Sequence, residues 1–167
     1  MKKECLLVVD VQKGFINEYT GHILLPIEKL QYSYKYVIYS KFYTKDDSSN
    51  FVKLLNLKDF YKDTDNYQLA IKELTNDERY LSIDKTKYSC VDDFLGWWLL
   101  SRQIKEVHIC GLETQACITK TALDLFDRDF TPIILSNLCA STESFKKHLE
   151  AIQTLKTLIG KKQVIEI

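Results

Sequence analysis

The chain has 167 residues, a length typical of one domain that can bury a hydrophobic core without disulfides or metals. Its 23 basic and 23 acidic residues cancel, which argues against nucleic acid or a membrane surface as a partner. The five cysteines are odd in number and include no CxxC pair, so the sequence predicts neither a disulfide framework nor a zinc site. This cysteine content is typical of a cytoplasmic protein.

Short apolar runs alternate with helical patterns along the chain. Strands are predicted at residues 5–11, 34–42, 79–85, 106–112, 130–137 and 163–167. Helices are predicted at residues 49–60, 91–104, 115–128 and 141–160, and residues 17–31 are expected to form a loop with one or two helical turns. This alternation predicts one α/β domain over residues 1–167, with three α/β/α layers around a mostly parallel six-stranded sheet. The first apolar run is expected to be a buried strand rather than a signal peptide.

Polar residues interrupt the apolar pattern where three predicted strands end. Asp10 ends the first strand, Lys85 ends the third strand with Lys87 close behind, and Cys117 stands at the start of the helix after the fourth. Ligands of open α/β sheets bind beyond the carboxyl ends of the strands, so we expect these side chains to share one cleft. Each also has an ordinary structural alternative: Asp10 as a turn cap, Lys85 as a solvated edge charge, and Cys117 as a small buried hydrophobe.

Taken together, the three side chains suit covalent acyl transfer. A helix N-terminus and a lysine ammonium are expected to lower the pKa of the Cys117 thiol and favour the thiolate. Asp10 would take the thiol proton and return it to a leaving amine, while backbone N–H groups of the turn before Cys117 would hold an oxyanion. The three histidines, His22, His108 and His148, fall in different predicted elements and are assigned structural roles.

The motifs that carry these residues resemble the isochorismatase-like cysteine hydrolases, which include nicotinamidases and N-carbamoylsarcosine amidase. The resemblance begins at "LLVVDVQKGF" and is strongest from "DKTKYS" to "VHICGLETQACITKTALDLF". It implies a Rossmann-like hydrolase fold, an Asp10–Lys85–Cys117 triad, and an oxyanion hole made by the N–H groups of Glu113 and Cys117. It also implies a cis peptide between Leu112 and Glu113.

The loop after the second predicted strand reads "SKFYTKDDSSNF" and lacks the Asp-x-His metal motif that nicotinamidases carry near this position. We therefore expect no metal and no cofactor, which weakens the case for nicotinamide as the substrate. Candidates for the pocket walls are Phe15, Phe42, Tyr88 and Trp98, with core packing the favoured role for Trp98.

The sequence thus predicts an enzyme, a cytoplasmic cysteine hydrolase of the amidase type. It would cleave a small amide or ureido C–N bond through a thioacyl intermediate. The expected partners are a small-molecule substrate and further copies of the chain in a homo-oligomer, with no nucleic acid and no membrane. Three alternatives stay open: vinyl-ether hydrolysis of the isochorismate type, a non-catalytic binding protein on the same fold, and a redox thiol with Cys90 as the resolving cysteine.

Overall fold

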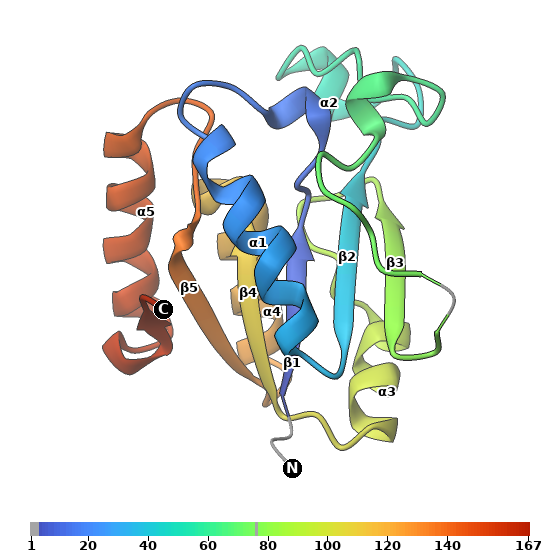
Figure 1. Ribbon diagram of the computed structural model, residues 1–167. Coiled ribbons are helices and arrows are strands. Elements are labelled where there is room, and N and C mark those ends of the chain that lie inside the picture. The colour runs from blue at the N-terminus through green and yellow to red at the C-terminus, as the bar shows by residue number, and fades with distance from the viewer. Residues whose placement is uncertain (1–3, 76) are drawn as a thin grey trace.

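A computed structural model describes residues 4–75 and 77–167 and shows one parallel sheet with helices on both faces (Figure 1). The strands are β1 (Glu4–Val9), β2 (Val37–Phe42), β3 (Tyr80–Lys85), β4 (Glu106–Gly111), β5 (Thr131–Cys139) and β6 (Val164–Ile165). The helices are α1 (Leu24–Leu30), α2 (Asn50–Lys53), α3 (Asp93–Ser101), α4 (Thr119–Phe126) and α5 (Phe145–Leu158). The strand order β3-β2-β1-β4-β5-β6, parallel throughout, confirms the predicted α/β fold.

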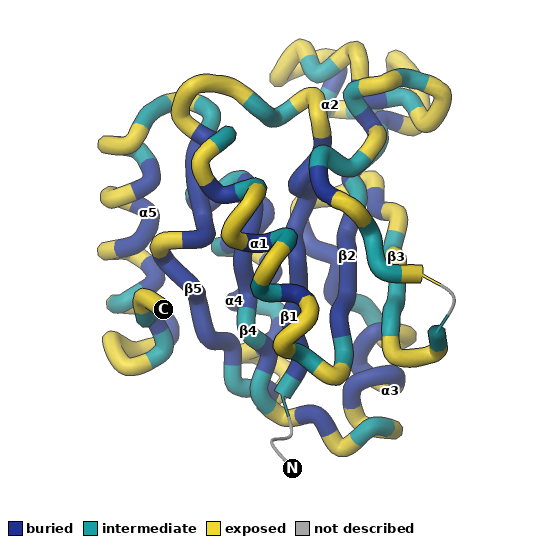
Figure 2. Tube along the Cα trace, viewed as in Figure 1, coloured by how far each residue is buried: buried dark blue, intermediate teal, exposed yellow. Residues whose placement is uncertain are grey.

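The alternation of side chains along β1 builds a core on each face of the sheet. Leu6 and Val8 pack toward Ile23 and Ile27 at α1, while Cys5, Leu7 and Val9 lie in the core formed with α3, α4 and α5. Both sets are fully buried, as expected for a central parallel strand whose two faces are covered (Figure 2). The strand β1 therefore lies in the middle of the sheet, and its end is flanked by the ends of β2 and β4.

Several predicted element boundaries differ from the structure. The helix expected at 49–60 is only the short α2: the Ser49 side chain caps it, and Asn56, at φ +57°, lies in a left-handed turn that a helix cannot contain. Residues 17–31 are more helical than expected, because α1 is flanked by 3₁₀ turns at 21–23 and 31–33. The last strand is reduced to two residues.

The helix after β4 begins one turn later than predicted. A π-helical turn at Thr114–Ile118 comes first, and Cys117 lies inside it rather than at the head of a regular helix. Among the described residues, no helix has the length and the apolar character that a membrane crossing requires.

Candidate active site

Asp10, Lys85 and Cys117 meet at the carboxyl edge of the sheet. Asp10 follows β1, Lys85 is the last residue of β3, and Cys117 comes from the turn after β4. The Lys85 ammonium lies 2.6 Å from Asp10 Oδ2 and 3.5 Å from Cys117 Sγ, and it also donates to the Lys87 carbonyl at 3.0 Å. All three residues are buried. The lysine therefore bridges the carboxylate and the thiol, whereas the Lys87 side chain is exposed.

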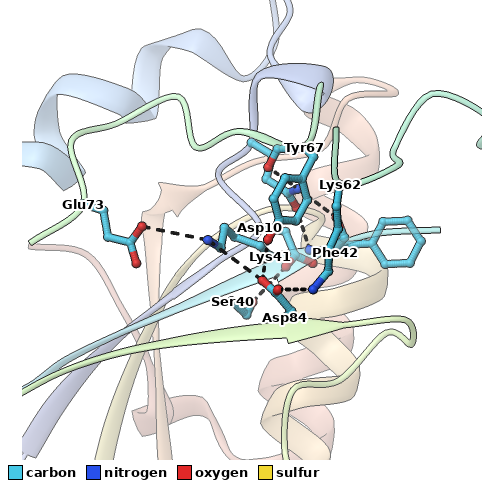
Figure 3. A network of polar contacts seen from close by, with 9 residues as sticks. Asp10, Ser40, Lys41, Phe42, Lys62, Tyr67, Glu73 and Asp84 are labelled. Atoms are coloured by element: carbon cyan, nitrogen blue, oxygen red, sulfur yellow. Dashed lines mark hydrogen bonds and ion pairs between the residues drawn. The ribbon is translucent and has the colours of Figure 1, made fainter. Parts of the chain in front are cut away.

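Asp10 is held in place by β2. Its N–H donates to the Ser40 carbonyl at 3.1 Å, and its Oδ1 accepts a hydrogen bond from the Ser40 hydroxyl at 2.8 Å (Figure 3). Each carboxylate oxygen thus has a partner of its own, Ser40 for Oδ1 and Lys85 for Oδ2. The residue has φ +49°, a left-handed conformation that Asp and Asn tolerate better than most residues. The chain turns sharply at this point.

Gln12 ties together the three segments around Asp10. Its side-chain nitrogen donates to the carbonyls of Phe42 and Tyr67 at 2.8 Å each, and its side-chain oxygen accepts from the Phe42 N–H at 2.7 Å. The residue is fully buried, so this amide satisfies backbone groups that would otherwise be costly to bury. The Asp-x-Gln pattern was visible in the sequence, but the positioning role of its glutamine was missed.

A second polar network lies on the neighbouring side chains of β2 and β3 (Figure 3). Asp84 accepts from the Tyr67 hydroxyl at 2.6 Å and from Lys62 at 2.5 Å, and Lys41 lies 3.9 Å from it and 4.0 Å from Glu73. Because successive strand residues point to opposite faces, Lys41 and Asp84 lie on the other face of the sheet from Ser40, Phe42 and Lys85. It fastens residues 62–73 to the edge of the sheet.

Burial and neighbouring charges set the protonation of the site. Burial by itself disfavours the Lys85 ammonium, but its neighbours, the Asp10 carboxylate foremost, outweigh burial and raise the pKa of Lys85. The expected lowering of the thiol pKa is wrong: burial first, and then the Asp10 charge, raise the pKa of Cys117 by more than Lys85 lowers it. The resting thiol is therefore protonated at neutral pH and needs a base, and the Asp10 carboxylate, held by the same Lys85 ammonium that contacts the sulfur, is the nearby group that can serve as one.

The backbone before Cys117 contains a cis peptide bond and a glycine with a positive φ angle. The peptide bond between Leu112 and Glu113 is cis, as the resemblance implied. Gly111 has φ +116°, and a Cβ there would lie 2.1 Å from the Val9 carbonyl oxygen, so only glycine fits. The N–H groups of Ala116 and Ile118 both donate to the Glu113 carbonyl at 3.0 and 3.1 Å, which closes the turn. Glu113 and Cys117, the predicted oxyanion donors, both lie on the wall of the same cavity.

This cavity has a volume of about 440 Å³. It is bounded by residues 14–17 after β1, by residues 51–60 between β2 and β3, and by the turns that contain Cys117 and Glu143. Its lining includes the predicted Phe15, Phe42 and Tyr88, together with Phe51, Leu55, Leu57 and Phe60, which sequence reasoning missed.

Trp98 does not line the cavity. Its side chain is buried in the core beneath α3 and meets the Tyr36 ring edge-to-face at 5.9 Å between centroids. The pocket role considered for this residue is therefore wrong, and the core role is the observed one. A pattern of apolar residues alone could not separate the two, because both need a buried aromatic ring.

The described residues offer no metal centre at the cavity. Asp46 and Asp47, in the loop after β2, are exposed and accept hydrogen bonds from Ser48 and Tyr61 respectively. The one group of described residues with ligand geometry is Glu4, Glu106 and His108, at the opposite end of β1 and β4. The donor set near Cys117 therefore does not fit a catalytic metal.

Comparison with known proteins agrees with this architecture. Residues 4–163 match the family model described as the Isochorismatase domain. Curated relatives include Isochorismatase domain-containing protein 2 from Bos taurus, 49% identical over 39 residues (23% of this chain and 19% of that protein). The protein of the same name from Rattus norvegicus is 35% identical over 66 residues (40% and 31%), so the chain spans less than a third of these relatives.

Solved structures match over nearly the whole chain. The pyrazinamidase/nicotinamidase of Streptococcus mutans has a TM-score of 0.84 at 20% identity, covering 97% of this chain and 99% of that one. A cysteine hydrolase of Pseudomonas syringae has a TM-score of 0.83 at 22% identity (98% and 88%). The nicotinamidase of Bacillus subtilis has a TM-score of 0.78 at 24% identity (98% and 99%). At these identities the likeness shows the shared fold.

Proposed function

Because the chain belongs to the isochorismatase domain family, we propose that it is a cysteine hydrolase that cleaves a small amide or ureido C–N bond through a thioester at Cys117. The observation that carries this proposal is the contact of one buried ammonium with both a carboxylate and a thiol, beside a cavity that the thiol lines. A nucleophile, a base and a cation that binds both are the parts this reaction needs.

The reaction would proceed in two halves. Asp10 takes the thiol proton as Cys117 Sγ attacks the substrate carbonyl, and Lys85 keeps a positive charge beside the sulfur while it becomes anionic. The N–H groups of Glu113 and Cys117 hold the oxyanion of the tetrahedral intermediate. As the C–N bond breaks, Asp10 gives its proton to the leaving amine. Water then attacks the thioester with Asp10 again as base, which releases the acid and restores the thiol.

The raised pKa of Cys117 suits this order of events. A thiol that stays protonated at rest is ionised only when a base accepts its proton in the same step as attack. Asp10 is fixed for that task by Ser40 on one oxygen and by Lys85 on the other.

The alternatives are less well supported. Isochorismate-type substrates are carboxylates, whereas the described lining of the cavity contains Glu113 and Glu143 and neither lysine nor arginine. A non-catalytic binding protein on the same fold would not require a buried ion pair beside a thiol, since apolar residues of similar volume often stabilise a core equally well. A redox role would need Cys90 to react, but Cys90 is 1% exposed and is not among the residues that line the cavity.

The proposal is tested by screening amides and ureides, with nicotinamide and pyrazinamide included, for release of ammonia or amine. Turnover by the native chain, its loss in Cys117→Ala, and a mass increase of one acyl group on Cys117 during turnover would support it. Turnover that persists in Cys117→Ala would contradict it. Homo-oligomerisation stays a prediction, and light scattering of the purified chain measures it.

A further inference from the structure

Resting on the proposed activity, we propose that the substrate carries a cationic nitrogen group, a protonated amine or an amidinium, which the Glu113 carboxylate and the aromatic wall of the cavity bind. This assigns the side chain of Glu113 a role in substrate selection, separate from the role of its backbone N–H.

The hydrogen bonds of Glu113 are incomplete in a way that points to a ligand. Its Oε2 accepts from the Thr142 N–H at 2.8 Å and from the Gln115 side-chain amide at 3.2 Å, so the carboxylate is held in one orientation. Its Oε1 is buried and has no hydrogen-bond partner, and the same is true of Gln115 Oε1. Both residues line the cavity, and both oxygens are covered by neighbouring atoms. A buried acceptor without a donor is costly, so a small shift of either side chain toward a ligand that brings a donor would be favourable.

The charge of the cavity lining has one sign. Glu143 is a second carboxylate on the same wall, and the Gln115 amide nitrogen, 3.3 Å from Glu143 Oε1, is shared between it and Glu113. Burial, with a further contribution from Glu143, raises the pKa of Glu113, the direction expected of a carboxylate without a cation. The nearby Lys85 ammonium does not supply that cation, because it is paired with Asp10 at 2.6 Å.

The rest of the lining suits a positive charge attached to an apolar body. Phe15 stacks on Phe60 with ring centroids 4.3 Å apart, and Phe51 contacts both Phe42 at 4.7 Å and Tyr88 at 5.0 Å. Aromatic faces attract ammonium and guanidinium-like groups, most strongly where water is excluded. A carboxylate-bearing substrate would meet two like charges and no cation among the described lining residues.

The test measures binding, so that it does not depend on turnover. In the Cys117→Ala background, calorimetry compares 4-(aminomethyl)benzamide with the near-isosteric 4-ethylbenzamide and with 4-(carboxymethyl)benzamide. We expect the cationic ligand to bind at least about tenfold tighter than the ethyl compound, as a charge-assisted hydrogen bond to a half-buried carboxylate implies. The anionic ligand should bind most weakly.

Adding Glu113→Gln to this background should remove most of the preference for the cation, since the amide keeps an acceptor for the Thr142 N–H but loses the charge. Glu150→Gln, a carboxylate change on the exposed face of α5, is the matched control and should leave the preference unchanged. Equal affinities, tighter binding of the anion, no binding of the cation, or a preference that survives Glu113→Gln would each overturn the proposal. Preference for the cation without hydrolysis of any amide by the native chain would instead refute the proposed activity and leave the cation site standing.

Discussion

Replacing Lys85 with methionine should destabilise the protein strongly, because it would leave the Asp10 carboxylate buried without its cation. The two side chains are 2% and 1% exposed, and their charged atoms are 2.6 Å apart. At an effective dielectric constant of about 20, this pair attracts by roughly 6 kcal/mol, which offsets the cost of desolvating both ions. Losing one partner of such a pair typically costs about 3–5 kcal/mol, and the remaining Ser40 hydroxyl can recover only a small part.

Removing both charges should be far less harmful than removing one. In Lys85→Met with Asp10→Asn no ion is left buried, and asparagine tolerates the φ of +49° at this position. We expect the double variant to regain at least about 2 kcal/mol of the free energy of unfolding lost in Lys85→Met. Turnover should be abolished in both variants, because the base and the cation act together.

The native protein, the two single variants Lys85→Met and Asp10→Asn, and the double variant form a mutant cycle, and urea unfolding of all four gives the coupling energy between Lys85 and Asp10. The matched control is Lys87→Met, which changes an exposed lysine two residues away. The control should lose less than about 0.5 kcal/mol and keep its activity. Additive losses in the cycle, or a Lys85→Met protein as stable as the native one, would refute the reasoning.

Four further predictions follow from the same geometry. Cys117→Ala should abolish turnover while changing the unfolding free energy by less than about 2 kcal/mol, which activity assays and urea unfolding check together. Iodoacetamide should modify Cys117, the one cysteine on the cavity wall, before the others, and the rate should still rise between pH 8 and 10 because the pKa of this thiol is raised; a rate that levels off below pH 9 would contradict this. Stability should fall as pH rises above about 9, because folding raises the pKa of each of the five thiols and the unfolded chain then releases protons that the native chain keeps. Urea unfolding at pH 8, 9 and 10 measures how the free energy of unfolding changes with pH. Activity should survive dialysis against EDTA, and loss on chelation with recovery on one added metal would show that a metal takes part.

The order and type of the elements were predictable because β1, β4 and β5 are dense apolar runs separated by helical periodicity. Asp10, Lys85 and Cys117 could be placed at one edge because the carboxyl ends of parallel strands converge. The short α2 could not be foreseen: Leu54 and Leu55 continue an apolar helical pattern, yet both are exposed, and Asn56 turns the chain away.

The protonation of Cys117 was also beyond the sequence. A helix start and a lysine both favour a thiolate, but the outcome depends on burial and on the distance to Asp10, and neither can be read from residue types. The cavity wall posed the same difficulty. Phe51 and Phe60 come from a segment with little regular structure. Their rings pack against the ring of Phe42, and all three residues line the cavity.

Much of the cavity wall and the three reacting residues come from different segments of the chain, so the substrate preference can change in evolution while the reacting residues stay in place. The ion pair and the thiol are fixed at strand ends and at the turn after β4, whereas Phe51, Leu55, Leu57 and Phe60 belong to one continuous stretch between β2 and β3. Gln12 and the Asp84 network anchor the flanks of that stretch, at Phe42 and at residues 62–73. Substitutions or length changes within residues 51–60 can therefore accumulate without disturbing Asp10, Lys85 or Cys117. That makes this stretch the natural region to randomise when selecting variants for new substrates.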